Sequence, residues 1–117
     1  MLSVLFYRTD AGNEPVLEWL RGLDADDRRI IGEDLRTVQL GWPLGMPLCR
    51  ALGGGLFEVR SSITDNRITR LIFFQHDAEL IIVVGFIKKS QSIPDDVLKL
   101  SRKRKSDYER NAPKAKK

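Results

Sequence analysis

The sequence predicts an α+β fold in which an antiparallel sheet packs on an N-terminal helical hairpin. An alternating apolar segment at residues 2–7 is followed by two segments with helical apolar spacing. Three more strand-like segments, at 56–62, 67–75 and 79–87, are separated by short turns. Short turns force antiparallel pairing, because a parallel connection needs a dozen or more residues. With a last helix that opens at Pro94, the predicted order is β-α-α-β-β-β-α.

Start and stop signals delimit the helical hairpin. Asn13 or Glu14 before Pro15 begins the first helix, because proline is tolerated at the first helical position and a polar side chain can cap the free amides. The second helix opens at Asp24 and closes at Gly41. Its apolar residues share one face directed at the core, namely Ile31, Leu35 and Val38.

The segment from Gly41 to Gly55 is rich in turn-forming residues and is predicted to be a loop that crosses the surface. Its glycine triplet, 53–55, is predicted to be a flexible turn that lacks the strand and helix of a phosphate-binding loop. Asp65-Asn66 and His76-Asp77-Ala78 are predicted to be hairpin turns. Residues 1–111 are expected to form a single domain, and residues 112–117 a disordered basic tail.

Length and composition place the chain among ordinary globular proteins. It has 117 residues, 42% hydrophobic and 31% charged, enough for one core without disulfides. The longest apolar run, Leu80 to Ile87, has eight residues, where a membrane span needs about 20. The apolar start lacks the basic region and cleavage site of a signal peptide. The expected location is therefore the cytoplasm.

Charge is unevenly distributed along the chain. Residues 1–87 contain nine arginines, no lysine and twelve acids, whereas residues 88–117 contain eleven basic residues and four acids. The first part therefore has a formal charge of −3 and the second of +7, which gives the total of +4. Clustered cations neutralise phosphates and release counterions. This asymmetry predicts a polyanionic partner such as RNA, DNA or a nucleoprotein.

Several kinds of chemistry are disfavoured by the residue types present. One cysteine, Cys49, and one histidine, His76, cannot build a zinc site or a nucleophilic triad. Cys49 is predicted to be a packing residue and His76 a surface turn residue. The acids lie at helix starts and turns, and Asp24, Asp26 and Asp27 are predicted to be caps or solvated side chains near the helix dipole. No metal or cofactor is expected.

Strand phase singles out one charged pair. Alternation puts Glu58 and Arg60 on one face with Leu56, and it puts Arg70 in phase with apolar neighbours that are predicted to be buried. A buried charge is costly unless it is paired, so Arg70 is expected to pair with Glu58 or to line a cleft. Two interpretations stay open at this point: a cross-strand ion pair that only stabilises the sheet, or a phosphate-binding or catalytic role.

The remaining cations suggest a basic face. Lys88 and Lys89 end the last strand, where the final helix departs. Arginine and lysine side chains converging there could stabilise the charge that develops when a 2′-hydroxyl attacks the adjacent phosphate, without a metal ion. A basic rim that only binds is the alternative. The residues predicted to bind substrate around Arg60 and Arg70 are Arg67, Lys103, Arg104, Lys105 and Tyr108.

Several motifs together resemble a known family. They are Val16-Leu17-Glu18-Trp19-Leu20, Leu44-Gly45-Met46-Pro47-Leu48, Gly53-Gly54-Gly55-Leu56-Phe57-Glu58-Val59-Arg60, Arg70-Leu71-Ile72-Phe73-Phe74 and Gly85-Phe86-Ile87-Lys88-Lys89 leading to Pro94. In these motifs the chain is similar to the phage-derived, HigB-like branch of the RelE/ParE toxin superfamily. The resemblance covers residues 4–110, nearly the whole chain.

This resemblance implies a RelE/ParE-like toxin of a type II toxin–antitoxin system. The group is regarded as ribosome-dependent mRNA interferases, each neutralised by a cognate antitoxin that usually carries a helix-turn-helix domain. Carried over to this sequence, the catalytic positions are Arg60, Arg70, Lys88 and Lys89, with Glu58 organising the site.

The chain also departs from the family pattern. It has Ile93 where the family tends to have threonine before the helix-opening proline, and it lacks the common tyrosine in the strand of Arg70. The missing tyrosine leaves Tyr108 as the nearest residue of its class. Two other functions stay open, because a fold does not fix a function. One is a non-enzymatic poison of gyrase, and the other is a phage-derived protein without toxicity.

Overall fold

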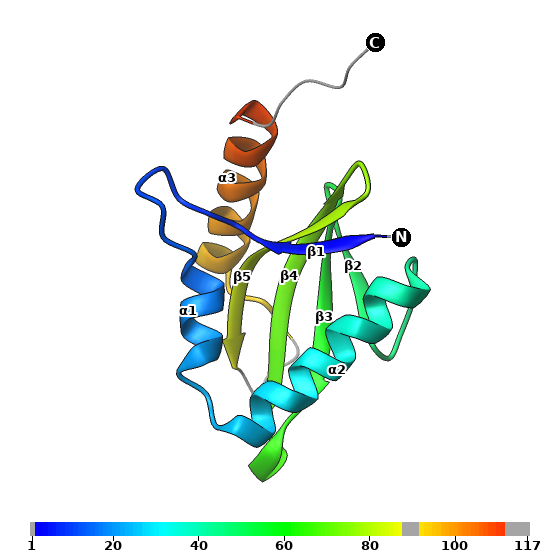
Figure 1. Cartoon of the computed structure of the whole chain (residues 1–117). Helices are drawn as coiled ribbons and strands as arrows, with labels where there is room; N and C mark the ends of the chain where they lie inside the picture. Colours follow the sequence, from blue (N-terminus) through cyan, green and yellow to red (C-terminus); the bar gives the residue numbers. More distant parts are fainter. Residues whose placement is uncertain (1, 88–91, 112–117) are drawn as a thin grey trace.

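The computed structural model describes residues 2–87 and 92–111, which form an α+β structure as predicted (Figure 1). A five-stranded sheet and three α-helices make up this part of the chain. The elements, in chain order, are β1 Ser3–Phe6, α1 Pro15–Arg21, α2 Ala25–Gly41, β2 Cys49–Gly53, β3 Leu56–Ser62, β4 Ile68–His76, β5 Glu79–Ile87 and α3 Asp95–Asn111.

The strand order in the sheet is β1-β5-β4-β3-β2. The strands β2 to β5 pair antiparallel, whereas β1 runs parallel to β5, so the sheet predicted to be antiparallel is mostly antiparallel. The connection explains the difference, because the helices that follow β1 give the chain enough length to return to the same sheet in a parallel sense.

The strand β2 is the main correction to the sequence-based prediction. Residues 49–53 were expected to belong to a surface loop, but they form an edge strand paired with β3. Gly53 ends β2, and Gly54 and Gly55 form the hairpin turn to β3, so a strand does precede this turn. Gly53, Gly54 and Gly55 have φ values of 90°, 64° and 83°, a region that residues with a Cβ atom rarely adopt. The glycines that indicated a loop are therefore what allows the hairpin to form.

The helix boundaries confirm the predicted signals, but the capping chemistry differs. The first helix begins at Pro15 and the second ends at Gly41. Neither the Glu14 nor the Asp24 side chain caps its own helix. Instead, the backbone N–H of Glu14 donates a hydrogen bond of 3.0 Å to the Glu18 carboxylate. The Glu18 side chain, one turn into α1, thus provides a hydrogen-bond acceptor for a backbone N–H at the start of the helix.

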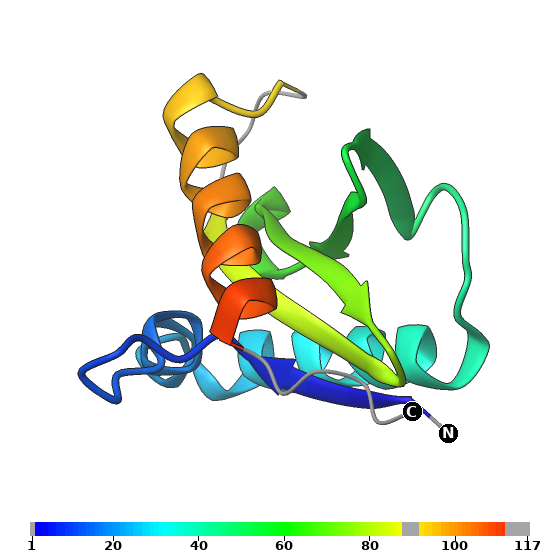
Figure 2. The same ribbon diagram turned by 90° about the horizontal axis from the view of Figure 1, so that it is seen from above.

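The helices cover the two faces of the sheet differently (Figure 2). The helices α1 and α2 lie on one face and α3 lies on the other. The first core contains buried residues such as Val16, Ile31 and Phe73, and the second contains residues such as Ile72, Phe74 and Ile81. Because α3 packs on β4 and β5, the α3 face is left more open along β3 and β2.

No helix in residues 2–87 and 92–111 is long and apolar enough to cross a membrane. Lys88, Lys89 and the predicted tail 112–117 lie outside the described residues.

Candidate functional site: an arginine cluster on the open sheet face

A buried ion pair joins β3 and β4. The Arg70 guanidinium donates a hydrogen bond of 2.8 Å from Nη1 to the Glu58 carboxylate. The residues are 1% and 0% exposed, respectively, so both charges are almost fully removed from water. This confirms the pairing that strand phase predicted. An arginine in this position needs such a partner, because an uncompensated buried charge is strongly destabilising.

Two more arginines reach the same carboxylate. In the sheet register, Arg50 lies opposite Glu58 on β2, and Arg60 lies opposite Arg70. The Arg50 Nη2 atom is 3.4 Å from Glu58 Oε2, and Arg60 Nε is 3.8 Å from Glu58 Oε1. We refer to Arg50, Glu58, Arg60 and Arg70 as the arginine cluster. Arg50 was missed by the sequence-based prediction because the segment that carries it was assigned to a loop.

The arginine cluster has an excess of positive charge. Its four side chains carry three positive charges and one negative charge, because arginine stays protonated at any ordinary pH. Arg70 is buried, but the side chains of Arg50 and Arg60 are 33% and 16% exposed. Solvent and ligands can therefore reach the cationic side of the cluster. Guanidinium groups held in a fixed arrangement favour phosphate, which they bind through two parallel hydrogen bonds.

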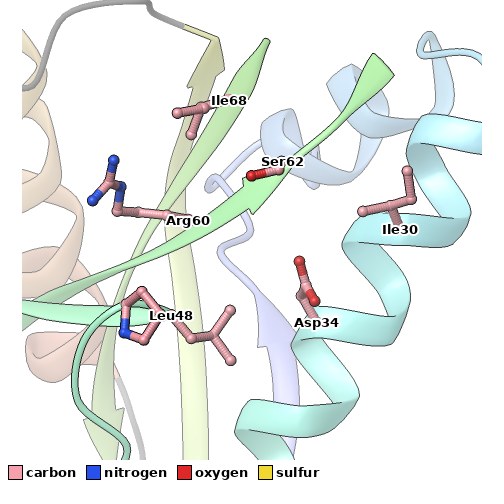
Figure 3. Close-up of a pocket in the computed structure, with 7 residues that line it drawn as sticks. Ile30, Asp34, Leu48, Arg60, Ser62 and Ile68 are labelled. Carbon is pink, nitrogen blue, oxygen red and sulfur yellow. The ribbon is translucent and has the colours of Figure 1, made fainter. Parts of the chain in front are cut away.

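A cleft opens beside the arginine cluster, where β3 extends past its pairing with β2 (Figure 3). It has a volume of about 430 Å³. Residues from α2, from the segment before β2, and from β3 and β4 line it, namely Ile30, Asp34, Pro47, Leu48, Arg60, Ser62 and Ile68. Arg60 therefore belongs both to the cleft wall and to the cluster. In Figure 3 its guanidinium points away from Asp34.

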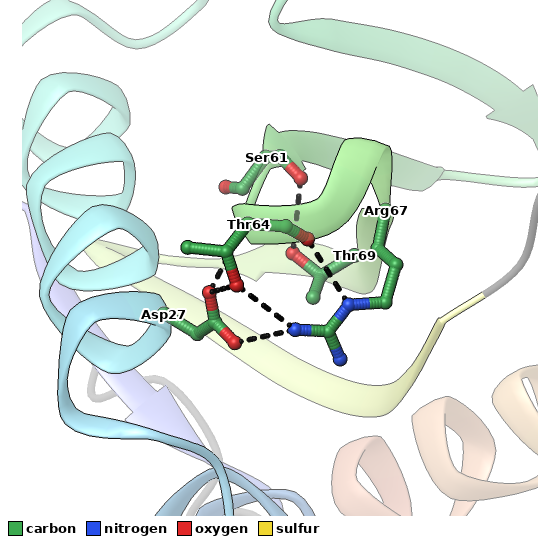
Figure 4. Close-up of polar contacts among 5 residues, drawn as sticks. All are labelled: Asp27, Ser61, Thr64, Arg67 and Thr69. Carbon is green, nitrogen blue, oxygen red and sulfur yellow. Dashed lines mark hydrogen bonds and ion pairs between the residues drawn. The ribbon is translucent and has the colours of Figure 1, made fainter.

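Arg67 lies in a different cluster, at the turn between β3 and β4 (Figure 4). Its Nη2 atom donates a hydrogen bond of 2.8 Å to Asp27 of α2, and its Nε donates one to the Thr64 carbonyl. Asp27 also accepts hydrogen bonds from the Thr64 backbone N–H and hydroxyl. The structure thus places Arg67 where it ties the turn to α2, and its predicted role in substrate binding stays a prediction.

Asp27 corrects an expectation from the sequence. It was predicted to be a cap or a solvated side chain, but it is only 1% exposed. The hydrogen bond from the Thr64 backbone, followed by the Thr64 hydroxyl and the Arg67 charge, lowers the pKa of Asp27 against the opposing effect of burial. Its partners are 37 and 40 residues away in the sequence, so local spacing could not reveal them.

The predicted residues of α3 do not join the arginine cluster. Arg104 donates from Nη1 to the Val83 carbonyl at 2.6 Å, and Lys103 lines a separate groove beside Tyr7. Lys105 pairs with Glu109 at 3.0 Å and lies over the Phe74 ring. Phe74 is four residues along β4 from Arg70, which corresponds to about 13 Å at ~3.3 Å per residue. The single concave basic face expected from the sequence is therefore divided into separate regions.

Tyr108 lies at that same far end of the sheet. Its ring packs edge-on against Phe74 and His76, and its hydroxyl donates a hydrogen bond of 2.9 Å to Glu79. Burial, together with the hydrogen bond and charge of Glu79, raises the pKa of Tyr108 to about 12. A hydroxyl with this pKa stays protonated at neutral pH, so it is a poor general base.

Cys49 is buried as predicted, and this burial raises its pKa to about 11. A thiol in that state is a poor nucleophile, because the thiolate is the reactive form. Within residues 2–87 and 92–111, no three His, Cys, Asp or Glu side chains gather in a way that could hold a metal ion.

The fold and the arginine cluster define a small α+β domain with a cationic site that solvent reaches on one sheet face. A family model described as phage derived protein Gp49-like (DUF891) matches residues 18–106, which is most of the chain. The chain belongs to this family. The family is associated with toxins of toxin–antitoxin systems. No curated protein matches the sequence.

Proposed function

We propose that the protein is the toxin of a type II toxin–antitoxin system and cleaves mRNA on the ribosome, as the HigB-like members of the RelE/ParE superfamily are regarded as doing. The observation that carries the proposal is the arginine cluster, with three guanidinium groups around one buried carboxylate. Membership of the Gp49-like family supports the toxin class. The RNA-cleaving activity is the further step that the arginine cluster supports.

The proposed reaction needs no metal ion. The 2′-oxygen of one ribose attacks the adjacent phosphorus while the bond from phosphorus to the 5′-oxygen of the next nucleotide breaks. The 2′-hydroxyl loses a proton and the leaving oxygen gains one, which gives a 2′,3′-cyclic phosphate and a 5′-hydroxyl. The phosphate carries extra negative charge in the transition state. Fixed guanidinium groups stabilise that charge without reorganising.

The four residues of the arginine cluster have different roles in this proposal. Arg50 and Arg60, which are partly exposed, contact the phosphate. Arg70 is buried against Glu58 and holds that carboxylate in place. Glu58 in turn orients the other two arginines, so it is a positioning residue. Lys88 and Lys89 keep their predicted role in proton transfer, and a lysine in that role needs a pKa lowered by neighbouring cations.

The partners follow from the same proposal. The substrate is mRNA on the ribosome, and a cognate antitoxin, expected to contain a helix-turn-helix domain, neutralises the toxin by covering the cationic face. The predicted substrate-binding residues Arg67, Lys103, Arg104, Lys105 and Tyr108 lie outside the arginine cluster, and their contacts with the RNA stay a prediction.

The test is cleavage of a reporter mRNA in a translating extract, mapped by primer extension. The wild-type protein is expected to cut the mRNA only while it is translated. Arg50→Ala and Arg60→Ala are expected to lower the rate by about 100-fold or more, as when one donor to a developing oxyanion is removed. The matched control, Arg36→Ala on the exposed side of α2, removes the same charge and should cleave normally. Intact mRNA with the wild-type protein would contradict the proposal, and DNA damage with intact mRNA would favour a gyrase poison.

A further inference from the structure

The geometry points to a second element of the site: the cleft beside Arg60 is a nucleobase-binding subsite, and Asp34 selects the base. This inference rests on the proposed function, since it assigns a base to the nucleotide whose phosphate the arginine cluster binds. The ligand is one base of an RNA strand that offers an amine or imine hydrogen to a carboxylate. Asp34 acts here as a specificity residue and takes no part in bond breaking.

The cleft has the size and walls that a base requires. Its volume of about 430 Å³ falls within the roughly 300–1,000 Å³ typical of small-molecule sites. Ile30 of α2, Leu48 before β2 and Ile68 of β4 supply apolar walls from three directions (Figure 3). A planar aromatic base can pack between such walls, and single-stranded RNA is recognised by unstacked bases in pockets of this kind.

Asp34 is the acidic side chain that lines this cleft. The residue is partly buried, and its side chain makes no hydrogen bond or ion pair with any residue in the described part of the chain. Its neighbour Glu33 points elsewhere and pairs with Arg29 at 3.5 Å. In Figure 3 the Asp34 carboxylate lies between Ile30 and Leu48, below Ser62. A carboxylate with unused acceptor capacity beside apolar walls can accept hydrogen bonds from a bound ligand.

An ionised carboxylate accepts hydrogen bonds and donates none, and this sets the expected base preference. Cytosine and adenine offer an exocyclic amine, and guanine offers an amine and a ring N–H side by side. Uracil offers one ring N–H, which lies between two carbonyl oxygens. These oxygens and a carboxylate repel each other, because both are negative and only accept hydrogen bonds. The subsite is therefore expected to prefer cytosine, adenine or guanine to uracil.

Arg60 connects this subsite to the phosphate site. Its side chain lines the cleft, while its Nε atom lies 3.8 Å from Glu58 in the arginine cluster. The guanidinium points away from Asp34 (Figure 3). A nucleotide can therefore place its phosphate at the guanidinium and its base along the Arg60 stem, toward the carboxylate.

The test is binding of four short RNAs that differ in one base and carry 2′-O-methyl groups to prevent cleavage. Affinity is measured by fluorescence anisotropy, and contact with the cleft is followed through the methyl NMR signals of Ile30 and Ile68. The wild-type protein is expected to bind the best RNA at least about 5-fold more tightly than the uracil RNA, as for one specific base contact. Asp34→Asn and Asp34→Ala are expected to remove this difference, whereas Glu33→Gln, one residue away and exposed, should keep it.

The outcomes separate this inference from the proposed function. RNAs that bind without shifting the Ile30 and Ile68 signals, or a base preference unchanged in folded Asp34→Asn, would overturn the subsite even if mRNA cleavage is observed. A base preference that Asp34→Asn abolishes would support the subsite even if the protein cleaves no mRNA. Cleft signals that respond to a cationic, leucine-containing peptide but to none of the RNAs would assign the cleft to a protein partner and overturn the inference.

Discussion

Glu58 is the residue on which the candidate site depends. Three arginines share its carboxylate, at 2.8, 3.4 and 3.8 Å, and it is completely buried. A buried carboxylate surrounded in this way compensates part of the positive charge. It accepts hydrogen bonds from Arg70 and Arg50 and forms a longer ion pair with Arg60. Without it the three cations would repel one another within one sheet face.

Replacing Glu58 with glutamine is expected to lower the free energy of unfolding by about 3 kcal/mol, because it leaves buried arginine charge uncompensated. Glutamine keeps the size and part of the hydrogen bonding, so the loss reports mainly the charge. Urea denaturation measures it, with Glu33→Gln on exposed α2 as the control, expected to change stability by less than about 0.5 kcal/mol. Equal stabilities of Glu58→Gln and wild type would contradict the role given to Glu58.

The contacts of Asp27 are expected to make the free energy of unfolding depend on pH. Its pKa is lowered in the folded state by the Thr64 backbone hydrogen bond and the other contacts of that cluster. The unfolded chain therefore binds a proton more readily, so the stabilisation is present above about pH 4 and is lost as pH falls through the lowered folded pKa. The stability difference between wild type and Asp27→Asn should be largest near neutral pH and shrink in acid.

Denaturant midpoints measured from about pH 7 down to about pH 3 test this expectation. Asp26→Asn is the matched control, because the Asp26 side chain is 76% exposed in the same turn of α2. A stability difference for Asp27→Asn that stays constant across the pH range would show that the Asp27 carboxylate does not stabilise the turn through its charge.

At the scale of single elements, α1 can pack closely on β5 because Gly85 of β5 has no side chain. A Cβ atom added to Gly85 would lie 2.7 Å from Leu71 Cδ2 and 2.9 Å from Trp19 Cζ3, closer than packed atoms tolerate. The Trp19 ring of α1 therefore lies directly on the β5 backbone. This contact gives a packing reason for Gly85 and Trp19, both of which lie within the residues that the Gp49-like family model matches.

Gly85→Ala is expected to destabilise the protein by about 1–3 kcal/mol, because the added methyl group forces Trp19 or Leu71 to move. Gly32→Ala serves as the matched control. A Cβ atom at Gly32 in α2 meets nothing within 4 Å, so alanine should stabilise the helix by about 0.5–1 kcal/mol. Thermal unfolding of the two variants compares them directly, and the account of this contact is wrong if both variants shift the melting temperature in the same direction.

The elements also show what could and could not be predicted from the sequence. The ranges 56–62 and 79–87 match β3 and β5, because long apolar runs between turn residues are strong strand signals. The strand β2 was missed, since the four residues 49–52, between a proline-rich segment and three glycines, look like a loop. A hairpin pattern was present, however, because Arg50 and Glu58 lie on opposite sides of the glycine triplet and pair with each other across the two strands.

For the whole molecule, the sequence predicted the charge asymmetry but not its arrangement in space. The Glu58–Arg70 pair followed from strand phase, which is a local rule. The separation of Arg67 and the α3 residues from the arginine cluster depends on long-range packing. For example, Arg67 is held by Asp27, which is 40 residues away in the sequence. The resulting site is smaller than expected: arginines on three adjacent strands, with the cations of α3 in separate regions.

The central claim is that this arginine cluster binds the phosphate of an RNA strand. It is tested most directly by the NMR signals of the arginine Nε–H groups during titration with a dinucleotide that carries a 2′-O-methyl group. The account predicts that the signals of Arg50 and Arg60 shift together and give one dissociation constant, while Arg29 on the exposed face of α2 is unaffected. Signals of Arg50 and Arg60 that stay unchanged while the dinucleotide binds elsewhere would contradict it.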